Sequence, residues 1–188
     1  MMKKIIVAVT GASGAVYARK VVERLLRSDE VEQVAVLVSD NGRKVMEYER
    51  ERLPEGDARM VYFDNEDLFA PPASGSAGYD GMAVVPCTMG TAGRIAAGIS
   101  ADLIGRAADV MLKERRRLVL VVREAPFSTV HLRNLTSLSE CGAVVLPASP
   151  SFYSRPADID ALCDTVAVRA VRLLGIASEG YEWDGGRS

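Results

Sequence analysis

Residues 4–14 read KIIVAVTGASG, and this stretch decides the expected fold. Its first half is apolar and rich in β-branched residues, which is typical of a short strand buried on both faces of a sheet. Small residues that include two glycines then end the strand. An amphipathic pattern follows at residues 15–27 and predicts a helix. A buried strand, a tight turn and a helix are the usual opening unit of a parallel α/β sheet.

Short apolar runs and longer helical patterns continue to alternate along the chain. We expect strands at residues 4–10, 33–38, 82–86, 118–122 and 143–146, with a weaker candidate at 60–63. We expect helices at residues 15–27, 41–52, 91–97, 103–114, 130–141 and 159–174. The alternation predicts a three-layer α/β fold, Rossmann-like or flavodoxin-like, in which a mostly parallel sheet carries helices on both faces.

The length of 188 residues fits a single domain, which we place at residues 1–177. Glycines near the end of the chain predict a flexible tail over residues 178–188. Residues 64–80 form a long loop, because Pro71 and Pro72 disfavour both a helix and a central strand. This loop is either a surface connection, an oligomer contact or one wall of a ligand site.

The composition excludes several classes of function. A formal net charge of -2 gives no broad positive field for nucleic acid or for an anionic membrane surface. No apolar run approaches the roughly 18 residues of a membrane span. Three widely spaced cysteines without a Cys-x-x-Cys pair indicate a reducing, cytoplasmic compartment and no zinc site. The single histidine, His131, argues against catalytic triads and multi-histidine metal centres.

Ligands of open parallel sheets bind beyond the carboxyl ends of the strands, so the residues that follow each strand are the first site candidates. After the first strand, the small residues from Gly11 to Ala15 allow backbone N–H groups and a helix dipole to approach a phosphate. The turn lacks the third glycine of dinucleotide sites and the Gly-Lys-Ser/Thr of triphosphate loops, which favours a mononucleotide such as FMN. A plain turn with Ser13 as helix cap explains these residues equally well.

Two further strand ends carry hydroxyl groups at the same predicted edge. Ser39 ends the second strand, where a helix N-cap is a simpler interpretation than a bond to a ligand. The segment from Thr88 to Thr91 gives a second turn with hydroxyl groups and a glycine before a helix. Two such turns together favour a ligand site more strongly than either turn alone. Cys87, beside them, is better explained by packing than by a nucleophilic role.

Charged residues supply the next candidates. Arg123 and Glu124 follow the fifth apolar run and form either a structural ion pair or part of a site in which Glu124 donates a proton. Arg106 and Lys113 lie seven residues apart on one predicted helix, so they share a face and can grip one phosphate.

The last strand and helix add aromatic and cationic candidates. Phe152 and Tyr153 follow the strand and can face a hydrophobic substrate, although core packing explains Phe152 equally well. Arg169, on the final predicted helix, is an ordinary surface residue unless a phosphate lies against it.

Together these motifs resemble those of the flavin prenyltransferase family, the UbiX-like proteins, from Lys3 to about Ile176. The motifs are Thr10-Gly11-Ala12-Ser13-Gly14-Ala15, Ala70-Pro71-Pro72-Ala73-Ser74-Gly75-Ser76, Arg106-Ala107-Ala108-Asp109-Val110, Leu112-Lys113-Glu114-Arg115-Arg116, Val122-Arg123-Glu124-Ala125-Pro126-Phe127-Ser128 and Phe152-Tyr153. Their order and spacing fit the family throughout. One departure is Leu68, where some members carry a tryptophan, so an aromatic wall is either missing or supplied by Phe69.

The resemblance implies a site for reduced FMN and for dimethylallyl phosphate. FMN would be held by Gly11, Ala12, Ser13, Ser39, Thr88, Met89, Gly90, Thr91 and Arg123. Tyr153 and Arg169 would help to bind dimethylallyl phosphate, and Arg106, Lys113 and Glu124 would converge on its phosphate. Glu49, which the pattern alone places exposed on the second helix, aligns with an active-site glutamate of the family. The implied catalytic residues are Ser13, Glu49, Arg106, Lys113, Glu124 and Tyr153.

The resemblance also implies the reaction. Members of this family join the prenyl group to the central-ring nitrogen of reduced flavin and then close a fourth ring onto the neighbouring aromatic carbon, without a metal. In that scheme Glu49 accepts the ring proton, with Ser13 as a relay, and Glu124 protonates the leaving phosphate. The prenylated FMN serves a UbiD-type decarboxylase, and similar proteins form large homo-oligomers, dodecamers among them.

Two alternatives fit parts of the pattern. A flavoprotein of the cysteine-decarboxylase type would use a histidine and an Asn-bearing Pro-Ala-Ser segment, whereas Pro72-Ala73-Ser74 here leads into Gly75. A non-catalytic flavin carrier or decarboxylase subunit would explain both glycine-containing turns. Such a carrier would not require Glu49, Tyr153 and the cationic residues together.

Overall fold

The computed structural model describes residues 2–183 and 185, so Met1, Asp184 and residues 186–188 of the predicted domain and tail lie outside the described residues. The six strands of the sheet are parallel and lie in the order β3-β2-β1-β4-β5-β6. They are β1 (Lys3–Val9), β2 (Val31–Val38), β3 (Met60–Phe63), β4 (Gly81–Cys87), β5 (Arg117–Val122) and β6 (Val144–Pro147). This strand order is the Rossmann one of the two predicted alternatives.

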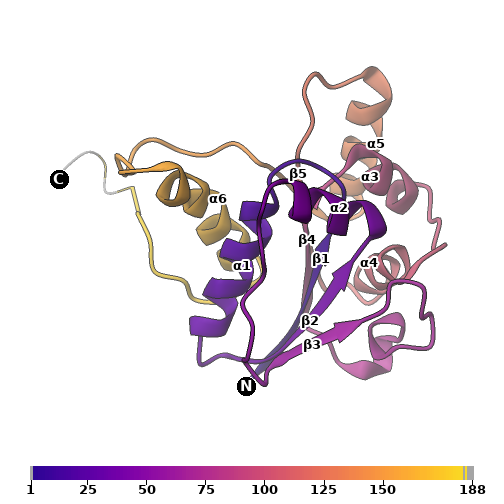
Figure 1. The fold of residues 1–188 in the computed structure, drawn as a ribbon. Coiled ribbons are helices and arrows are strands. Elements are labelled where there is room, and N and C mark those ends of the chain that lie inside the picture. The colour runs from indigo at the N-terminus through magenta and orange to yellow at the C-terminus, as the bar shows by residue number, and fades with distance from the viewer. Residues whose placement is uncertain (1, 184, 186–188) are drawn as a thin grey trace.

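Helices cover both faces of the sheet, as Figure 1 shows. The helices α1 (Ala15–Arg27), α2 (Asp40–Tyr48) and α6 (Ile159–Leu173) pack on one face. The other face carries α3 (Met89–Ala96), α4 (Leu103–Lys113), α5 (Thr129–Glu140) and the short 3-10 turns η1 (Pro71–Ala73) and η2 (Gly75–Ala77). In the part of the chain that the structure describes, none of the helices is long and apolar enough to cross a membrane.

The centre of the sheet explains where a ligand site can lie. Ile5 and Val7 of β1 point into the apolar cluster beneath α1 and α6, and Ile6 and Ala8 point into the opposite cluster. Both faces of β1 are therefore buried, as expected for a central parallel strand. β1 pairs with β2 on one side and with β4 on the other, so the strand order reverses between β1 and β4. Ligands of open α/β sheets bind at such a reversal, beyond the carboxyl ends of the strands.

Most predicted elements are confirmed within a few residues, including the weak strand candidate at 60–63. The second helix is the exception, because it ends at Tyr48 and not at Arg52. Glu49 is its C-cap, and Arg50 adopts a left-handed backbone conformation with a φ of 57°. A left-handed residue turns the chain out of a helix. Glu49 thus lies at the end of α2 and is half-buried, and its predicted exposed position within the helix is wrong.

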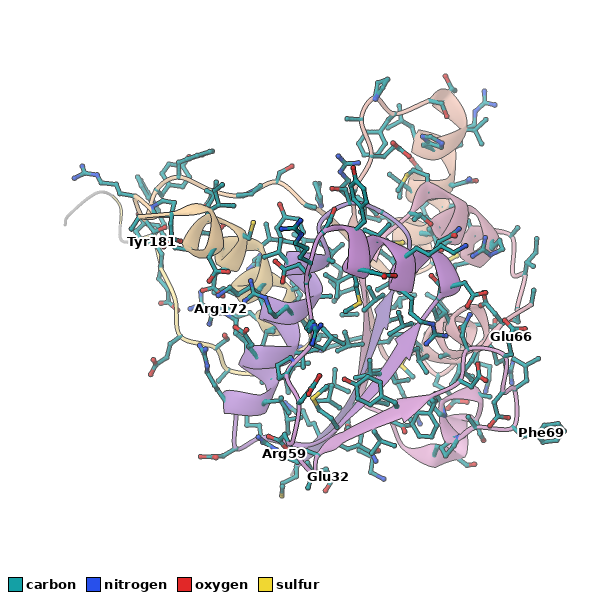
Figure 2. The ribbon with its side chains drawn as sticks, viewed as in Figure 1. Glu32, Arg59, Glu66, Phe69, Arg172 and Tyr181 are labelled. Atoms are coloured by element: carbon teal, nitrogen blue, oxygen red, sulfur yellow. The ribbon has the colours of Figure 1, made fainter. Side chains whose placement is uncertain are left out.

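The long loop at residues 64–80 packs against α4 through its two 3-10 turns. The Arg106 Nε donates to the carbonyl oxygen of Ala73 over 3.1 Å, and the Arg116 Nη2 donates to that of Gly75 over 2.8 Å. Phe69 is fully exposed on this loop, and Figure 2 shows it pointing away from the protein. Within a single chain, Phe69 therefore does not supply an aromatic wall to a site.

The described part of the tail lies along α6. Arg24 and Arg172 hydrogen-bond to residues 178–180. Tyr181 stacks on Tyr153, with ring centroids 6.5 Å apart and 13° between the ring planes, and Figure 2 shows Tyr181 beside α6. This segment thus makes specific contacts, and its predicted flexibility stays a prediction.

Candidate active site

Thr10 ties the two central strand ends together. It follows β1 and is only 2% exposed. Its hydroxyl donates to the carbonyl oxygen of Pro86 over 2.7 Å and accepts the backbone N–H of Thr88 over 3.0 Å. A buried hydroxyl with both a donor and an acceptor partner holds its neighbours in fixed positions. The turn after β1 and the turn after β4 therefore form one connected edge.

We expect Thr10→Val to loosen this edge. Valine keeps the shape of threonine but removes the hydroxyl, so the buried bonding groups lose a partner at a cost of about 1–3 kcal/mol. Urea unfolding should show that decrease in the free energy of unfolding. Thr136→Val is the matched control, because the exposed Thr136 hydroxyl bonds within its own helix, to the carbonyl oxygen of Leu132. Equal losses in both variants would contradict the special role of Thr10.

Glycines allow the first turn and α2 to approach each other closely. A Cβ at Gly11 would lie 2.5 Å from the Cβ of Asn41, and a Cβ at Gly42 would lie 2.5 Å from the carbonyl oxygen of Val9. Both distances are far below van der Waals contact, so a side chain at either position would force the two segments apart. Ser39 caps α2 by accepting the N–H of Gly42 over 3.0 Å, which confirms the cap interpretation. The first turn and the start of α2 are thus direct neighbours.

The second turn offers a place for an anion. Thr88 caps α3, since its hydroxyl accepts the N–H of Thr91 over 3.0 Å. Gly90 is exposed, and a Cβ there would meet no neighbouring atom closer than 3.9 Å. Open space over the first turn of a helix, with backbone N–H groups and the positive end of the helix dipole, suits a phosphate.

Glu49 occupies the start of α1. One carboxylate oxygen accepts the N–H of Ala15 over 2.8 Å, and both oxygens lie 3.0 Å from the backbone nitrogen of Gly14. The first turn was expected to present these N–H groups to a phosphate. For Gly14 and Ala15 that expectation is wrong, because a carboxylate of the chain itself already uses their N–H groups. The first turn instead brings Glu49 to the edge of the sheet, and the start of α3 remains for a phosphate.

Opposing effects set the ionisation of Glu49. Burial raises its pKa, but hydrogen bonds from the Ser13 hydroxyl and from the N–H groups of Ala15 and Gly14, with the positive charge of Arg123, lower the pKa by more. The carboxylate is therefore ionised at neutral pH. Its partners are residues of the first turn and of the segment after β5, which draws three elements into one site.

We expect the bonding of Glu49 to make stability depend on pH. A carboxyl whose pKa is lower in the folded chain stabilises the fold above its ordinary value of 4.5, and this stabilisation is lost as the pH falls through the folded pKa. The wild type should therefore exceed Glu49→Gln in free energy of unfolding at neutral pH, and the difference should shrink below about pH 4. Urea titrations at the two pH values measure this. A difference that does not change with pH would contradict it.

Arg123 and Glu124 extend from the same edge of the sheet. The backbone N–H of Arg123 donates to the carbonyl oxygen of Cys87 over 3.2 Å, which places Arg123 beside the second turn. The Arg123 charge also acts on Glu49, as described above. The side chains of Arg123 and Glu124 are exposed and accessible to a ligand at this edge.

Tyr153 and Arg169 lie on the α6 side of the molecule. Phe152 and Tyr153 are 71% and 70% exposed, so the alternative assignment of Phe152 to the core is wrong. The N–H of Ser151 donates to the Thr165 Oγ1 over 3.1 Å and anchors the loop of Tyr153 on α6. Arg169 is exposed on the same helix and lines a cavity of about 230 Å³ with Ser151 and Thr165. Ser151, from the loop of Tyr153, thus lines the same cavity as Arg169.

Arg106 and Lys113 lie elsewhere. They share one face of α4, as predicted, but Arg106 pairs with Asp109 over 2.7 Å and Lys113 pairs with Glu114. Lys113 precedes β5 and Glu124 follows it, so at about 3.3 Å per residue the strand separates their backbones by about 20 Å. The predicted convergence of Arg106, Lys113 and Glu124 on one phosphate is therefore wrong for a single chain.

His131 has a structural role. Its Nδ1 accepts the N–H of Ser128 over 3.2 Å, and its own N–H donates to the Ser128 Oγ over 3.2 Å. These two bonds form a capping box at the start of α5. Because this is the only histidine of the chain, its use as a cap argues against the cysteine-decarboxylase alternative.

Thr10 begins the first family motif, but no sequence pattern gave it a role of its own. None pointed to Arg19, which binds Glu51 over 2.6 Å near the site. A hydroxyl that ends an otherwise apolar buried strand is a usable signal for Thr10. Arg19 gives no such signal, because a cation on an amphipathic helix is expected to face solvent.

The residues at this edge fit FMN. A phosphate needs open N–H donors, which the start of α3 provides at Gly90. The positive charge of Arg123 complements an anionic cofactor.

The chain matches the Flavoprotein family over residues 1–171. Flavin prenyltransferase UbiX of Methanocaldococcus jannaschii is 41% identical over 175 residues, which cover 92% of this chain and 94% of that protein. The structure of AnUbiX in complex with FMN and dimethylallyl pyrophosphate has a TM-score of 0.86 at 39% identity, covering 97% and 100% of the two chains. The dodecameric FMN-dependent UbiX-like decarboxylase of Escherichia coli O157:H7 has a TM-score of 0.88 at 36% identity, again covering 97% and 100%. The fold, the edge built around Thr10 and these relatives agree with the motif resemblance, and the chain belongs to the flavin prenyltransferase family of UbiX-like flavoproteins.

Proposed function

We propose that this protein transfers the dimethylallyl group of dimethylallyl phosphate to reduced FMN and so makes prenylated FMN. The observation that carries the proposal is the ionised, half-buried carboxylate of Glu49, held at the start of α1 beside the connected turns. A reduced flavin ring bound at this edge would have the Glu49 carboxylate beside it as a proton acceptor. The names of the relatives support the same activity.

The residues of the two turns would hold the cofactor. They are Gly11, Ala12, Ser13, Ser39, Thr88, Met89, Gly90, Thr91 and Arg123. When bound, reduced FMN supplies the nucleophilic ring that receives the prenyl group. The open start of α3 would take its phosphate, and Arg123 would add a positive charge.

The remaining residues would act on the donor and on protons. Glu49 accepts the proton released when the fourth ring closes, and the Ser13 hydroxyl orients the Glu49 carboxylate or relays that proton. Glu124 gives a proton to the leaving phosphate. Tyr153 and Arg169 hold the donor, and the aromatic face of Tyr153 helps to keep water from the allylic group.

We further propose a large homo-oligomer in which a neighbouring copy supplies Arg106 and Lys113. The distance between Lys113 and Glu124 along β5 supports this, because one chain cannot bring both to the same phosphate. The Arg106 bond to the carbonyl oxygen of Ala73 supports it too, because a loop that docks on a neighbour would carry Arg106 with it.

Exposed apolar side chains give the oligomer its contact surfaces. Leu68 and Phe69 lie exposed on the long loop, and Phe127, Val130 and Leu132 lie exposed around the start of α5. Groups of apolar side chains on the surface of a protein commonly mark contacts between chains. Burial of these two groups against neighbouring copies would remove them from water.

The test is anaerobic incubation of the protein with reduced FMN and dimethylallyl phosphate, with dimethylallyl diphosphate in a parallel reaction. Mass spectrometry should find a flavin that is heavier by one prenyl unit with the monophosphate. If prenylated flavin formed only with dimethylallyl diphosphate, the diphosphate would be the donor. If the protein bound flavin but left it unmodified with both donors, the assignment as a transferase would be wrong, and a non-catalytic flavin carrier would be favoured.

The product requires an acceptor, which we infer to be a UbiD-type decarboxylase. Activation of the purified apo-decarboxylase by the reaction mixture, and not by FMN alone, would test this partner. A cytoplasmic location is part of the same proposal, and it is supported by Cys87, Cys141 and Cys163, which are all unpaired.

A further inference from the structure

Arg19, on the second turn of α1, binds carboxylates from three parts of the chain. Its Nε donates to Glu51 over 2.6 Å, its Nη1 to Glu23 over 3.0 Å and its Nη2 to Asp160 over 2.6 Å. The side chains of Arg19 and Glu51 are only 23% and 22% exposed. A guanidinium whose three nitrogens all bond to carboxylates is fixed in orientation. Arg19 therefore joins α1 to two other segments.

The first of these segments carries Glu49. Glu49 binds the N–H groups at the start of α1, and Glu51 binds Arg19 on the same helix. Between them, Arg50 holds a φ of 57°, which an L-residue adopts only when its surroundings impose it. Two attachments to α1 thus define the turn that presents Glu49.

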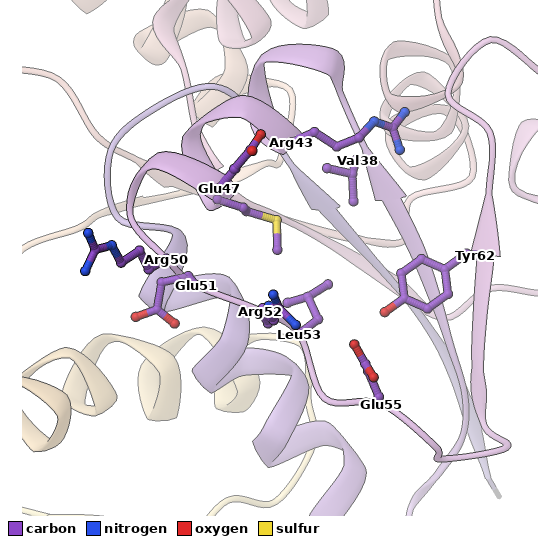
Figure 3. Close-up of a pocket in the computed structure, with 10 residues that line it drawn as sticks. Val38, Arg43, Glu47, Arg50, Glu51, Arg52, Leu53, Glu55 and Tyr62 are labelled. Atoms are coloured by element: carbon purple, nitrogen blue, oxygen red, sulfur yellow. The ribbon is translucent and has the colours of Figure 1, made fainter.

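Packing does not hold this turn from its other side. A cavity of about 860 Å³ lies behind it, and its walls include Arg50, Arg52 and Tyr62. Figure 3 shows Arg50, Glu51 and Arg52 on one side of this cavity and Tyr62 of β3 on the other. Leu53 is the first residue of the segment that is buried in the core. Because a cavity lies behind it, the turn depends on its hydrogen bonds for its position.

The second segment carries Tyr153. Asp160 lies in the first turn of α6, directly after the loop of Tyr153, and it also pairs with Lys20 of α1. The other end of the loop is attached to α6 by the bond from Ser151 to Thr165. Asp160, bound to both Arg19 and Lys20, therefore attaches the end of this loop to α1.

We propose that Arg19 is a positioning residue, which holds Glu49 and the loop of Tyr153 in a fixed relation to each other through α1. The inference rests on the proposed function, because it takes Glu49 as the proton acceptor and Tyr153 as part of the donor site. The bond to Glu51 sets the position of Glu49, and the bond to Asp160 sets the position of the donor loop. Loss of Arg19 frees the Glu51 carboxylate and leaves Asp160 with Lys20 as its partner on α1.

Four variants test the two links. Arg19→Met should lower kcat for prenylated FMN by about 10-fold to 100-fold and also raise KM for dimethylallyl phosphate, because small displacements of reacting groups are costly. Glu51→Gln should lower kcat with little change in KM. Asp160→Asn should raise KM with a smaller change in kcat. Arg19→Lys keeps the charge but not the three-way geometry, so it should recover part of the lost rate.

Arg24→Met is the matched control. Arg24 joins the same two helices by its ion pair with Asp164, but its bonds go to α6 and the tail and not to the turn of Glu49. Its kcat should stay within about twofold of the wild type. A loss of kcat in Arg24→Met equal to that in Arg19→Met would overturn the proposal, because any break between α1 and α6 would then suffice.

Amide hydrogen exchange gives a readout that is independent of turnover. Residues 49–52 should exchange about tenfold faster in Arg19→Met and Glu51→Gln than in the wild type, and no faster in Arg24→Met. Unchanged exchange in Arg19→Met would overturn the proposal even if its kcat fell. If the wild type formed no prenylated flavin, the proposed function would fail, and exchange would still decide whether Arg19 holds this turn.

Discussion

Glu49→Gln is expected to lower kcat for prenylated FMN by about 10²-fold to 10⁴-fold, the usual contribution of a positioned proton acceptor. Glutamine keeps the length of the side chain and an oxygen that can accept the N–H of Ala15. Its amide cannot accept a proton, so the chemistry is lost while the turn is retained. Anaerobic turnover followed by mass spectrometry measures the loss, and quenching of flavin fluorescence measures whether FMN still binds.

Glu47→Gln is the control for this experiment. Glu47 lies on the same helix, is exposed, and faces the cavity behind the turn, as Figure 3 shows. The variant removes the same charge from the same helix, so its kcat should remain close to that of the wild type. Retention of more than about a tenth of kcat by Glu49→Gln would contradict proton transfer as its role. Parallel loss of product and of FMN binding would show that Glu49 mainly shapes the cofactor site.

The end of α2 shows why part of this site could not be predicted. The helical pattern of the sequence continues to Arg52, and local preference gives no reason to stop earlier. The chain leaves the helix because Glu49 and Glu51 are both bound by α1, and Arg50 takes a left-handed conformation between them. Tertiary hydrogen bonds have here overridden helix propensity. The core strands were predictable because burial on both faces leaves an unbroken apolar run.

The two turns at the sheet edge were predictable for a different reason. In a parallel sheet the carboxyl ends of all strands meet at one edge, so Ser13, Thr88 and their neighbours could be grouped before their positions were known. Glu49 was found only through family resemblance, because nothing in the neighbouring sequence distinguishes it from the other charged residues of the chain. Resemblance also grouped Arg106 and Lys113 with Glu124, although a single chain keeps Lys113 and Glu124 at opposite ends of β5. Residues that share one site can belong to different copies of a chain, and a sequence does not say which.

Complementation between two inactive variants should show whether Glu49 and Lys113 of one site come from different copies of the chain. Lys113→Gln is expected to lower kcat/KM for dimethylallyl phosphate by about 10²-fold or more, because a phosphate leaving without its cation is poorly stabilised. Glu49→Gln is inactive for the reason given above. Co-expression of the two chains with different tags, followed by purification on both tags, isolates mixed oligomers.

Mixed oligomers of Glu49→Gln and Lys113→Gln should regain about one quarter of wild-type activity. If each site takes Glu49 from one copy and Lys113 from another, then in a random assembly about one site in four contains both residues intact. Glu49→Gln mixed with Arg123→Gln is the matched control. Because Arg123 acts on Glu49 within one chain, no site in that mixture contains both intact residues, and no activity should return. Recovery in the first mixture alone would place Lys113 in the site of a neighbour. Equal behaviour of the two mixtures would mean that each site is built from a single chain, and the assembly would then have no catalytic role.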